Sequence, residues 1–420
     1  KIKKMGVQNA YFPLLIPEKL LNKEKEHVEG FSPEVAWVTH TGKSKLEERL
    51  AIRPTSETIM YEAYARWIRS WRDLPLRLNQ FNSVIRWEFK NPVLFLRTRE
   101  FLWNEGHTAF ATKKEAEKEC TDILNTYYDV LKDLLALHSV KGKKTEKEKF
   151  AGAEYTISTE LFMPHGRAIQ GPDAHHDGQN FAKAFGIEFL DEKEKKQHVW
   201  QNTWAISTRV IGILIAAHGD DKGLVLPPNI APNQIVIVPI IFKKEGEKVL
   251  KKAKELVKQL KEHNVILDDR DYSPGWKYNE WELKGVPLRI EIGPNDLKKK
   301  QVIIVRRDTG KKEIVKENKV KEVVHKLLED MQKNLYKQSE KIFTSKKTKA
   351  ATMSALQKVI KQKKFAEVHW CGETTCEETI KDKTEGAKIL NIPFEQPKKV
   401  SNCVCCKKQG KHQVIVAKSY

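Results

Sequence analysis

A proline-rich segment divides this chain and limits how it can fold. Pro227, Pro228 and Pro232 lie within six residues of one another, and proline fits neither a helix interior nor a central strand. Residues 1–230 mix predicted strands with helices and form a first predicted domain. Residues 231–340 alternate short apolar strands with helices, which is typical of an α/β domain with a partly parallel sheet. Residues 341–420 contain five of the six cysteines and form a third predicted domain.

The predicted elements follow the hydrophobic periodicity on both sides of this segment. Apolar side chains three or four residues apart predict helices, and short apolar or alternating runs predict strands. In the first domain these are strands over 81–89 and 101–105, a helix that opens at Thr55, and helices over 113–137 and 209–217. In the second they are strands over 235–242, 265–267, 288–292 and 302–305, and helices over 247–263 and near 317–342. The predicted fold class is therefore α/β.

Bulk composition narrows the class of protein. Of 420 residues, 40% are hydrophobic and 31% charged, which suits a soluble chain with substantial cores. No apolar run approaches the length of a membrane span. Lysine and arginine number 76 against 56 acidic residues, a formal charge of +20. Such an excess favours a polyanionic partner, because binding to phosphates releases counterions, although a merely soluble surface is the alternative.

The cysteines are few but clustered. Six in a chain of this length do not make a disulfide scaffold, and Cys120 suits a buried apolar position on a helix. The other five fall within the last fifty residues. Paired cysteines at close spacing, separated by a loop, suit a tetrahedral Cys₄ zinc site, and reduced free thiols are the alternative.

A charged stretch in the first domain gives the strongest indication of chemistry. Arg86 and Glu88 lie two residues apart on a predicted strand and share a face; alone, they would suggest a structural ion pair. Arg97 follows after a short loop, and Phe101 comes four residues later. Two arginines on paired strands beside an aromatic ring suit a bent triphosphate and a stacked base, because the guanidinium fork matches phosphate oxygens and stays charged.

This stretch resembles motif 2 of the class II aminoacyl-tRNA synthetases, in which Arg-x-Glu and a loop precede Arg-x-x-x-Phe. The longer segments 86–90, 95–107 and 53–58 are similar to the prolyl-tRNA synthetase family of the eukaryotic and archaeal-like type. Residues 201–209 resemble motif 3 of the same class. The resemblance covers nearly the whole chain. It implies an α+β catalytic domain with an antiparallel sheet, an α/β anticodon-binding domain and a small zinc-binding C-terminal domain.

The resemblance implies specific roles around ATP. Arg86 would hold the α-phosphate and the substrate carboxylate, where negative charge builds during the reaction, and Arg97 would contact the γ-phosphate. Phe101 and Arg209 would cover the two faces of adenine, and Glu88 would carry Mg²⁺ or meet the adenine amino group. Arg86 and Arg209 are the expected catalytic residues. The implied ATP-binding set is Arg86, Glu88, Arg97, Thr98, Phe101, Gln170, Ser207 and Arg209.

The family also implies an amino-acid pocket. A proline substrate offers a secondary ammonium, which suits a carboxylate such as Glu57, and an apolar ring, which suits an aromatic wall such as Trp103. Without their flanking residues, His107 and His175 would be interpreted as satisfied core histidines. The implied set is Thr55, Glu57, Arg86, Trp103, Glu105, His107 and His175.

Two positions depart from the family pattern. Asp173 stands where the family has a threonine, and Ala205 stands where motif 3 has a glycine. We expect proline to remain the main substrate, with altered tolerance for alanine or cysteine. His175, His176 and Asp177 could also suggest metal ligands, but adjacent side chains on a strand point apart.

The later domains add two binding predictions. Basic and aromatic side chains over 269–277 and 280–289 resemble the family's anticodon-binding domain and suit unstacked bases; a surface turn with structural tryptophans is the alternative. In the tail, the resemblance implies Cys371, Cys376, Cys403 and Cys405 as zinc ligands, with Cys406 able to replace one of them. The terminal Tyr420 resembles a family tyrosine that folds back towards the active site.

The resemblance implies ATP-dependent activation of L-proline to prolyl-adenylate and its transfer to the 3′ end of tRNA(Pro). ATP, Mg²⁺ and a structural Zn²⁺ are the expected cofactors, and no membrane is expected. Residues 6–13 resemble the end of motif 1, which builds the dimer in this class, so we expect a cytoplasmic homodimer. Because the chain begins at Lys1, part of the first domain is expected to precede it.

Two alternative functions agree less well with these residues. A non-catalytic tRNA-binding relative would tend to lose the motif arginines, whereas Arg86, Arg97 and Arg209 all stand here. An enzyme for threonine or another small amino acid could share the second domain. The cysteine-bearing tail and the terminal tyrosine argue against it.

Overall fold

The computed structural model describes the backbone of residues 1–27, 34–88, 91–241 and 245–420, and the side chains of these residues apart from 23–27. Phe89 and Phe242, the last residues of two predicted strands, lie outside this set. The chain forms two compact units: residues 1–128, 139–213 and 346–420 make the first, and residues 129–138 and 214–345 the second. The division into three domains at 230/231 and 340/341 stays a prediction.

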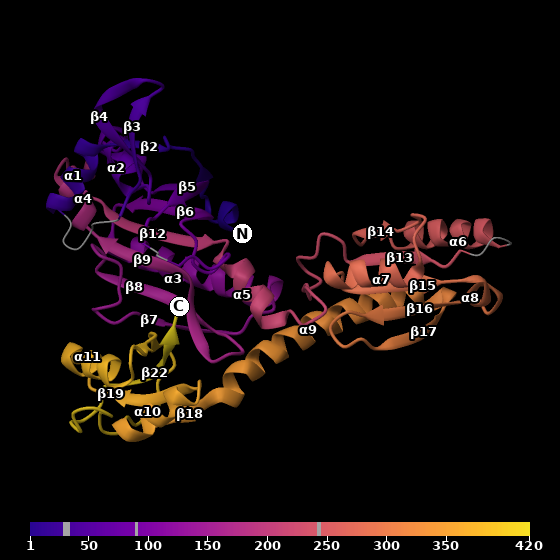
Figure 1. Ribbon diagram of the computed structural model, residues 1–420. Helices are drawn as coiled ribbons and strands as arrows, with labels where there is room; N and C mark the ends of the chain where they lie inside the picture. Colours follow the sequence, from indigo (N-terminus) through magenta and orange to yellow (C-terminus); the bar gives the residue numbers. More distant parts are fainter. Residues whose placement is uncertain (28–33, 89–90, 242–244) are drawn as a thin grey trace. The chain divides into compact units, whose positions relative to one another are not determined.

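A largely antiparallel sheet is the framework of the first unit (Figure 1). Its central strands are β5 (Leu76–Ile85), β6 (Glu100–Phe110), β12 (Trp200–Ser207) and β9 (Arg167–Gly178), each antiparallel to the next. Next to β9 lie β8 (Tyr155–Phe162) and then β7 (Ser139–Lys143). This order confirms the antiparallel sheet predicted for the first domain.

The two faces of this sheet carry different side chains, because neighbours along a strand point to opposite sides. On one face, Trp204 packs against Tyr127 and other apolar side chains of α3 (Lys113–Asp129). On the other face, the strand register places Glu105 between Gln80 of β5 and Ala205 of β12. The second face is therefore polar, and the candidate site forms on it.

Helix α2 (Glu57–Trp67) covers part of the polar face. Its side chains Met60, Tyr61 and Tyr64 are buried against Phe181 and neighbouring apolar residues, which fixes Glu57 in the first helical turn. The other elements of this region are β1 (Gln8–Asn9), β2 (Leu15–Pro17), α1 (Glu18–His27), β3 (Trp37–Thr41), β4 (Ser44–Ile52), α4 (Asn180–Phe185), β10 (Glu188–Leu190), β11 (Lys196–His198) and α5 (Arg209–His218).

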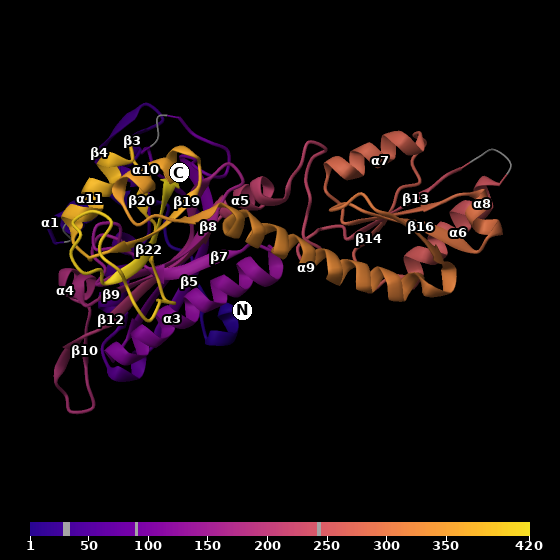
Figure 2. The same cartoon turned by 90° about the horizontal axis from the view of Figure 1, so that it is seen from below.

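The C-terminal segment joins the first unit by extending its sheet. Strand β22 (His412–Ser419) is antiparallel to β19 (Phe365–Trp370) and parallel to β9, with Lys418 opposite Arg167 (Figure 2). A buried Lys144 binds Glu160 at 2.6 Å and the Leu390 carbonyl at 2.8 Å, which ties the segment to β8. Its other elements are β18 (Lys347–Lys349), α10 (Met353–Lys361), α11 (Thr374–Lys383), β20 (Lys388–Ile389) and β21 (Ile392–Pro393).

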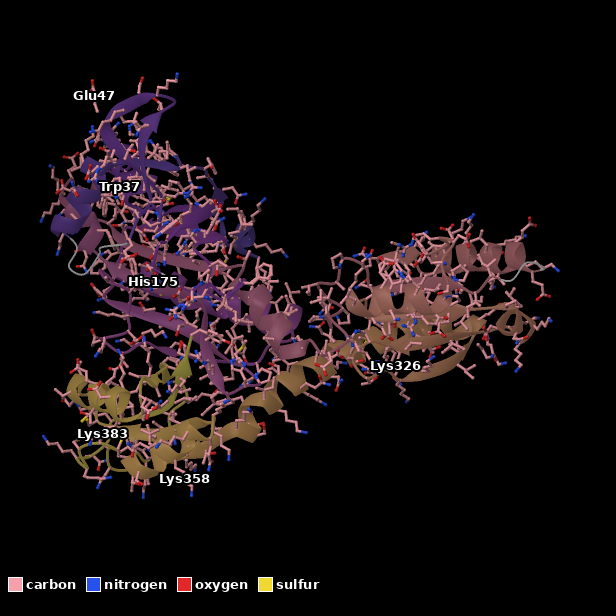
Figure 3. The ribbon with its side chains drawn as sticks, in the orientation of Figure 1. Trp37, Glu47, His175, Lys326, Lys358 and Lys383 are labelled. Atoms are coloured by element: carbon pink, nitrogen blue, oxygen red, sulfur yellow. The ribbon has the colours of Figure 1, made fainter. Side chains whose placement is uncertain are left out.

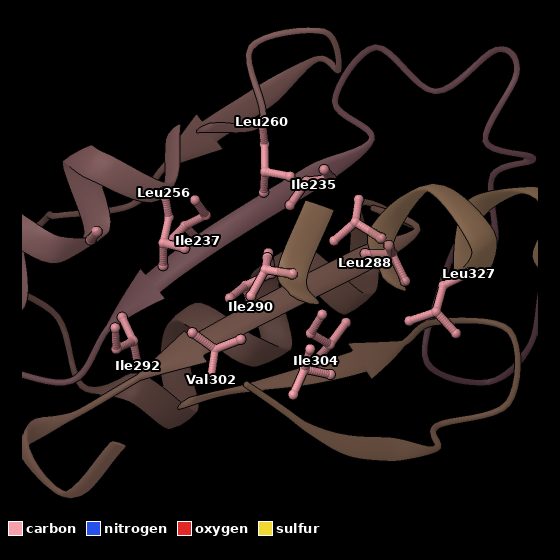
Figure 4. Close-up of a cluster of buried hydrophobic side chains, with 14 of the residues drawn as sticks. Ile235, Ile237, Leu256, Leu260, Leu288, Ile290, Ile292, Val302, Ile304 and Leu327 are labelled. Carbon is pink, nitrogen blue, oxygen red and sulfur yellow. The ribbon is translucent and has the colours of Figure 1, made fainter. Parts of the chain in front are cut away.

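The second unit contains a five-stranded mixed sheet in the order β14-β13-β15-β16-β17. The first three strands are parallel and the last two antiparallel, which confirms the partly parallel sheet predicted from sequence. Side chains such as Ile237, Leu256 and Ile290 meet in its core (Figure 4). None of the helices within the described residues is long and apolar enough to cross a bilayer.

The elements of the second unit follow one another as strands and helices in alternation. They are β13 (Ile235–Pro239), α6 (Gly246–Gln259), β14 (Val265–Leu267), α7 (Pro274–Leu283), β15 (Leu288–Ile292), α8 (Pro294–Lys298), β16 (Gln301–Arg306), β17 (Lys312–Lys316) and α9 (Val320–Lys346).

Candidate active site

A cavity of about 230 Å³ opens on the polar face of the first unit's sheet. Every residue predicted for the amino-acid pocket lines it: Thr55, Glu57, Arg86, Trp103, Glu105, His107 and His175. These residues come from segments far apart in the chain, and Figure 3 labels His175 among the side chains of this unit. The structure brings the seven together on one surface, and the role of each stays a prediction.

Glu105 is the centre of a hydrogen-bond network in the cavity wall. Its Oε1 accepts from Gln80 Nε2 at 2.8 Å, from Asn82 Nδ2 at 2.6 Å and from the Ser56 hydroxyl. Its Oε2 lies 3.1 Å from His107 Nε2. Burial by itself raises the pKa of Glu105, but the hydrogen bond and charge of His107 lower it overall. Both carboxylate oxygens of Glu105 are therefore engaged by neighbouring side chains, among them His107.

The pKa of His107 is raised in this wall. Burial by itself lowers its pKa, but the hydrogen bond with Glu105 and the charges of Glu57 and Glu105 raise it overall. The Nδ1 of His107 lies 3.4 Å from the Tyr61 hydroxyl oxygen, and Glu57 accepts a hydrogen bond from the Thr55 hydroxyl. Two carboxylates, Glu57 and Glu105, thus lie near one histidine, which leaves negative charge in the wall for a cationic ligand group.

The pKa of His175 shifts in the opposite direction to that of His107. Burial lowers its pKa, and the opposing charge of Asp173 does not reverse this. Its Nδ1 lies 2.8 Å from the Thr156 hydroxyl oxygen. His176 turns to the other face of the sheet, where its Nδ1 lies 2.9 Å from Asn202 Oδ1. The two histidines therefore diverge, which contradicts the alternative reading of this segment as metal ligands.

Three arginines bring positive charge to the cavity region. The Nε of Arg86 donates to the Pro54 carbonyl at 3.0 Å, and its guanidinium carbon lies 5.6 Å from the centre of the Phe101 ring. The Nε of Arg209 donates to the Leu96 carbonyl at 3.1 Å. Burial lowers the pKa of Arg209, the charge of Asp173 opposes this, and the charges of Arg86 and Arg97 lower the pKa further. Arg86 and Arg97 therefore repel Arg209, which an anion between them would relieve.

The other residues predicted to bind ATP differ in how close they lie to the cavity. Gln170 lines the cavity, and its carbonyl accepts from Arg209 at 3.5 Å. Ser207 Oγ accepts from the Arg209 backbone at 3.4 Å, while Thr98 and Phe101 are half-buried at the start of β6. Glu88 is exposed beyond the end of β5 and is not among the residues that line the cavity.

Both departures from the family pattern face the cavity. Asp173 and Ala205 line it and lie opposite each other on β9 and β12. The Oδ2 of Asp173 accepts from Gln170 Nε2 at 2.5 Å. The added carboxylate thus lies between the residues predicted for the amino acid and those predicted for ATP.

Several lining residues were not predicted from the sequence. Glu148, Lys149 and Phe150 come from the loop before β8, and Thr156 comes from β8 itself. The Phe150 ring centre lies 4.7 Å from that of His175. No motif marks this loop, and the one available signal is an aromatic residue in an otherwise charged stretch. Its position over β9 arises only when the strands pair.

Four cysteine sulfurs cluster in the C-terminal segment. The Sγ atoms of Cys371, Cys376, Cys403 and Cys406 all lie within 4.8 Å of one another. The cluster contains Cys406, the possible replacement, in place of the predicted Cys405, and the choice of zinc ligand stays a prediction. The Lys407 amide donates to the Cys403 carbonyl at 3.1 Å, and the resulting turn brings residue 406 to the same side as residue 403. Four thiols at this spacing suit tetrahedral zinc.

Exposed aromatic rings gather at one end of the second unit. Tyr272 and Trp276 stack with their ring centres 4.3 Å apart, and the guanidinium carbon of Arg270 lies 5.5 and 5.3 Å from the two rings. Both rings remain accessible, at 53% and 46% of their full exposure. Accessible rings beside a cation suit an unstacked base.

Comparison with known families agrees with this architecture. Residues 37–218 match the family model of the tRNA synthetase class II core domain (G, H, P, S and T), and residues 234–329 match that of an anticodon binding domain. The fold and site therefore define a class II aminoacyl-tRNA synthetase. Residues 353–420 match the model described as prolyl-tRNA synthetase, C-terminal. Together with the relatives below, this match shows that the chain belongs to the prolyl-tRNA synthetase family.

The relatives span the chain from end to end. It is 50% identical over 423 residues to the proline--tRNA ligase of Alkaliphilus oremlandii (strain OhILAs), covering 100% of this chain and 87% of that protein. It is 50% identical over 414 residues to the cytoplasmic proline--tRNA ligase of Arabidopsis thaliana, with 96% and 78% covered. It is 47% identical over 448 residues to the bifunctional glutamate/proline--tRNA ligase of Mus musculus, with 100% and 30% covered.

Proposed function

We propose that Arg86, Arg97 and Arg209 carry the first step of a proline--tRNA ligase reaction. The chain is such a ligase and uses ATP, proline and tRNA(Pro). In the proposed step a proline carboxylate oxygen attacks the α-phosphorus of ATP, and the bond to the bridging oxygen breaks to release pyrophosphate. The 3′-terminal hydroxyl of tRNA then attacks the acyl carbon, and AMP leaves.

The observation that carries this assignment is the position of Arg86. It lines the cavity predicted for the amino acid, and it lies close enough to Arg209 to lower the pKa of that residue. A guanidinium at this junction can bind the attacking carboxylate and the α-phosphate together. It stabilises the charge that develops between them, and no general base is needed.

Proline would sit with its ring against aromatic walls and its nitrogen towards negative charge. Trp103 and Phe150 line the cavity, and Glu57 together with the Glu105–His107 pair supplies the excess negative charge. Thr55 donates to Glu57 and would hold it in position. A charged ammonium matches this arrangement because opposite charges attract strongly where water is excluded.

The remaining nucleotide contacts complete the proposal. Arg97 would bind the γ-phosphate, Phe101 would stack on adenine, and Thr98, Gln170 and Ser207 would supply polar contacts. Glu88 would hold Mg²⁺ against the phosphates, since exposed carboxylates are suitable Mg²⁺ ligands.

Proline-dependent exchange of pyrophosphate into ATP tests the proposal. Replacing Arg86 by alanine should reduce the exchange rate at least ~100-fold, because one charge-stabilising donor is lost. The matched control is Arg306→Ala, since Arg306 pairs with Asp308 in the second unit and should leave exchange unchanged. Strongest exchange with an amino acid other than proline, across a panel including alanine and cysteine, would overturn the proline pocket.

We further propose that the four-cysteine cluster holds a structural Zn²⁺. Thiolates 2.3 Å from a tetrahedral zinc lie about 3.8 Å apart, within the spread that the structure shows. Cys406→Ser should then lose zinc, measured as metal per chain, while Cys405→Ser should retain it. Retention by both variants would contradict the assignment of Cys406.

The assembly and setting of the enzyme are also proposals. Tyr11, Phe81 and Leu102 are 71%, 63% and 60% exposed, and exposed apolar surface of this kind supports a homodimer. Light scattering that gives the monomer mass at micromolar concentration would contradict it.

We propose domain boundaries at 1–230, 231–340 and 341–420, and anticodon contact by Tyr272 and Trp276. We also propose a cytoplasmic location, which the name of the plant relative supports.

A further inference from the structure

A second cavity in the first unit is lined by positive charge. It measures about 440 Å³ and lies where the start of β9 meets α10, α11 and β22. Six of its twelve lining residues are lysine or arginine, against 76 of 420 in the whole chain. We call it the basic hollow, and its six cations are Arg167, Lys361, Lys363, Lys364, Lys383 and Lys418.

These cations are not balanced by carboxylates. Within the described part of the chain, none of the six takes part in an ion pair, and the one acidic residue of the lining is Glu385. The Nζ of Lys418 donates to the Glu385 backbone carbonyl at 3.0 Å, and Arg167 lies over the Tyr420 ring. Both contacts fix the side chains and leave their charge uncompensated.

The accumulated charge acts on a neighbouring side chain. Burial lowers the pKa of His165, and the charges of Arg167, Lys346 and Lys363 lower it further. His165 also lies 3.0 Å from the Tyr420 hydroxyl. The cations come from separate segments that the fold packs around one hollow, so the positive charge stays concentrated there. Such a concentration of charge attracts a multivalent anion.

Local structure explains only part of the cluster. Helices α10 and α11 end beside the hollow, and lysines such as Lys361 and Lys383 are favourable at helix C-termini. Arg167 and Lys418 lie instead on paired strands β9 and β22, so stabilisation of a helix C-terminus does not explain these two cations. Their convergence on the same hollow therefore needs another reason.

We propose that the basic hollow binds phosphates of the acceptor arm of the tRNA substrate. The choice of RNA rests on the ligase function, because tRNA is the polyanion that such an enzyme must hold. The hollow and the active site share strand β9, and the eight residue steps from Arg167 to His175 span roughly 26 Å. An RNA whose 3′ end reaches the cavity could place its duplex backbone at this distance. Such contacts would be independent of sequence.

The test uses the full chain with three exposed or half-exposed lysines neutralised together, Lys361→Gln, Lys364→Gln and Lys383→Gln. The matched control is Lys43→Gln, Lys193→Gln and Lys195→Gln, which removes the same charge from exposed sites elsewhere in the first unit. Binding is measured for full tRNA(Pro) and for a minihelix that contains only the acceptor arm, over a series of salt concentrations.

The hollow variant should bind both RNAs about tenfold more weakly at moderate salt, and the slope of log affinity against log salt should become shallower by roughly 2. The control should change little. Proline-dependent pyrophosphate exchange, which needs no RNA, should be unchanged in both variants. Equal weakening in the two variants, or a loss with full tRNA but not with the minihelix, would overturn the proposal.

Exchange activity separates this inference from the ligase function itself. If exchange fails already in the unsubstituted chain, the proposed function is wrong. If exchange falls only in the hollow variant and in step with RNA binding, the lysines support the catalytic fold, and the RNA site is rejected.

Discussion

Arginines lie in or beside a cavity in each of the two units, but they are held in different ways. In the second unit, Arg306 binds Asp308 at 2.7 Å and Arg307 binds Asp220 at 2.6 Å. In the first unit, Arg86 and Arg209 donate to backbone carbonyls instead. A guanidinium paired with a carboxylate is neutralised and stabilises the fold, whereas one oriented by a carbonyl keeps its charge for a ligand.

The difference extends to the carboxylates. Asp268 of the second unit receives hydrogen bonds from Arg270 and Trp281, which lower its pKa to about 2. In the first unit, burial raises the pKa of Asp177 well above its usual range, and Glu57 adds to this. Asp268 is therefore compensated by its partners, whereas Asp177, on the same strand as the cavity residue His175, is not, and perturbed groups of this kind tend to lie near functional sites.

The largest effect should come from Arg209. Arg209→Ala should lower proline-dependent exchange ~100- to 1,000-fold, because an adenine and phosphate contact is lost, with little change in the unfolding midpoint. Arg306→Ala should show the reverse, with normal exchange and lower stability. Equal loss of exchange in both variants would contradict the different roles assigned to the arginines of the two units.

His107→Gln tests the buried pair of the cavity wall. The raised pKa of His107 means that its stabilisation is fully present below about pH 6.5 and is lost as the pH rises through the folded-state value. The variant should be less stable by about 2–3 kcal/mol at pH 7, and the gap should narrow at pH 9. Urea unfolding at both pH values measures this. His325→Gln is the control, because His325 is exposed, and an equal loss there would contradict the reasoning.

Asp268→Asn tests a compensated carboxylate in the second unit. Its lowered pKa contributes stability that is present above about pH 4 and is lost as the pH falls towards 2. The variant should lose on the order of 1–2 kcal/mol at pH 7, a value reduced because its partner Arg270 is exposed to solvent. The steepness of acid unfolding should decrease with it. The neighbouring exposed Asp269, replaced by asparagine, should leave acid unfolding unchanged, and a similar response from both would refute the assignment.

Asp173→Thr should have the smallest effect. Removing a carboxylate beside the predicted phosphate site should lower the KM for ATP by roughly two- to fivefold, because one repulsive charge is lost. Stability should not change. Exchange kinetics with proline and with alanine measure the effect and also show whether selectivity moves. An increase in the KM for ATP would show that Asp173 supports nucleotide binding.

Much of the site could be predicted because its residues lie in compact motifs. Thr55 and Glu57 share one segment and Trp103, Glu105 and His107 another, and the resemblance of these segments to the family implied the pocket. Lys149 and Phe150 could not be predicted, since their loop reaches the cavity only through the pairing of β8 with β9. The cluster contains Cys406 and not the predicted Cys405, because a local turn, and not the spacing, decides which sulfur approaches the others.

By itself the sequence determined the two strand patterns on either side of the prolines, the motif arginines and the presence of a cysteine cluster. These depend on local periodicity and on short-range spacing. Only the tertiary structure decided which arginines are paired with carboxylates, which histidine has a raised pKa and which a lowered one, that Cys406 lies in the cluster, and that six cations converge on one hollow. Each of these depends on burial and on contacts between distant segments, because electrostatic energy is set by distance and solvent exposure and not by order along the chain.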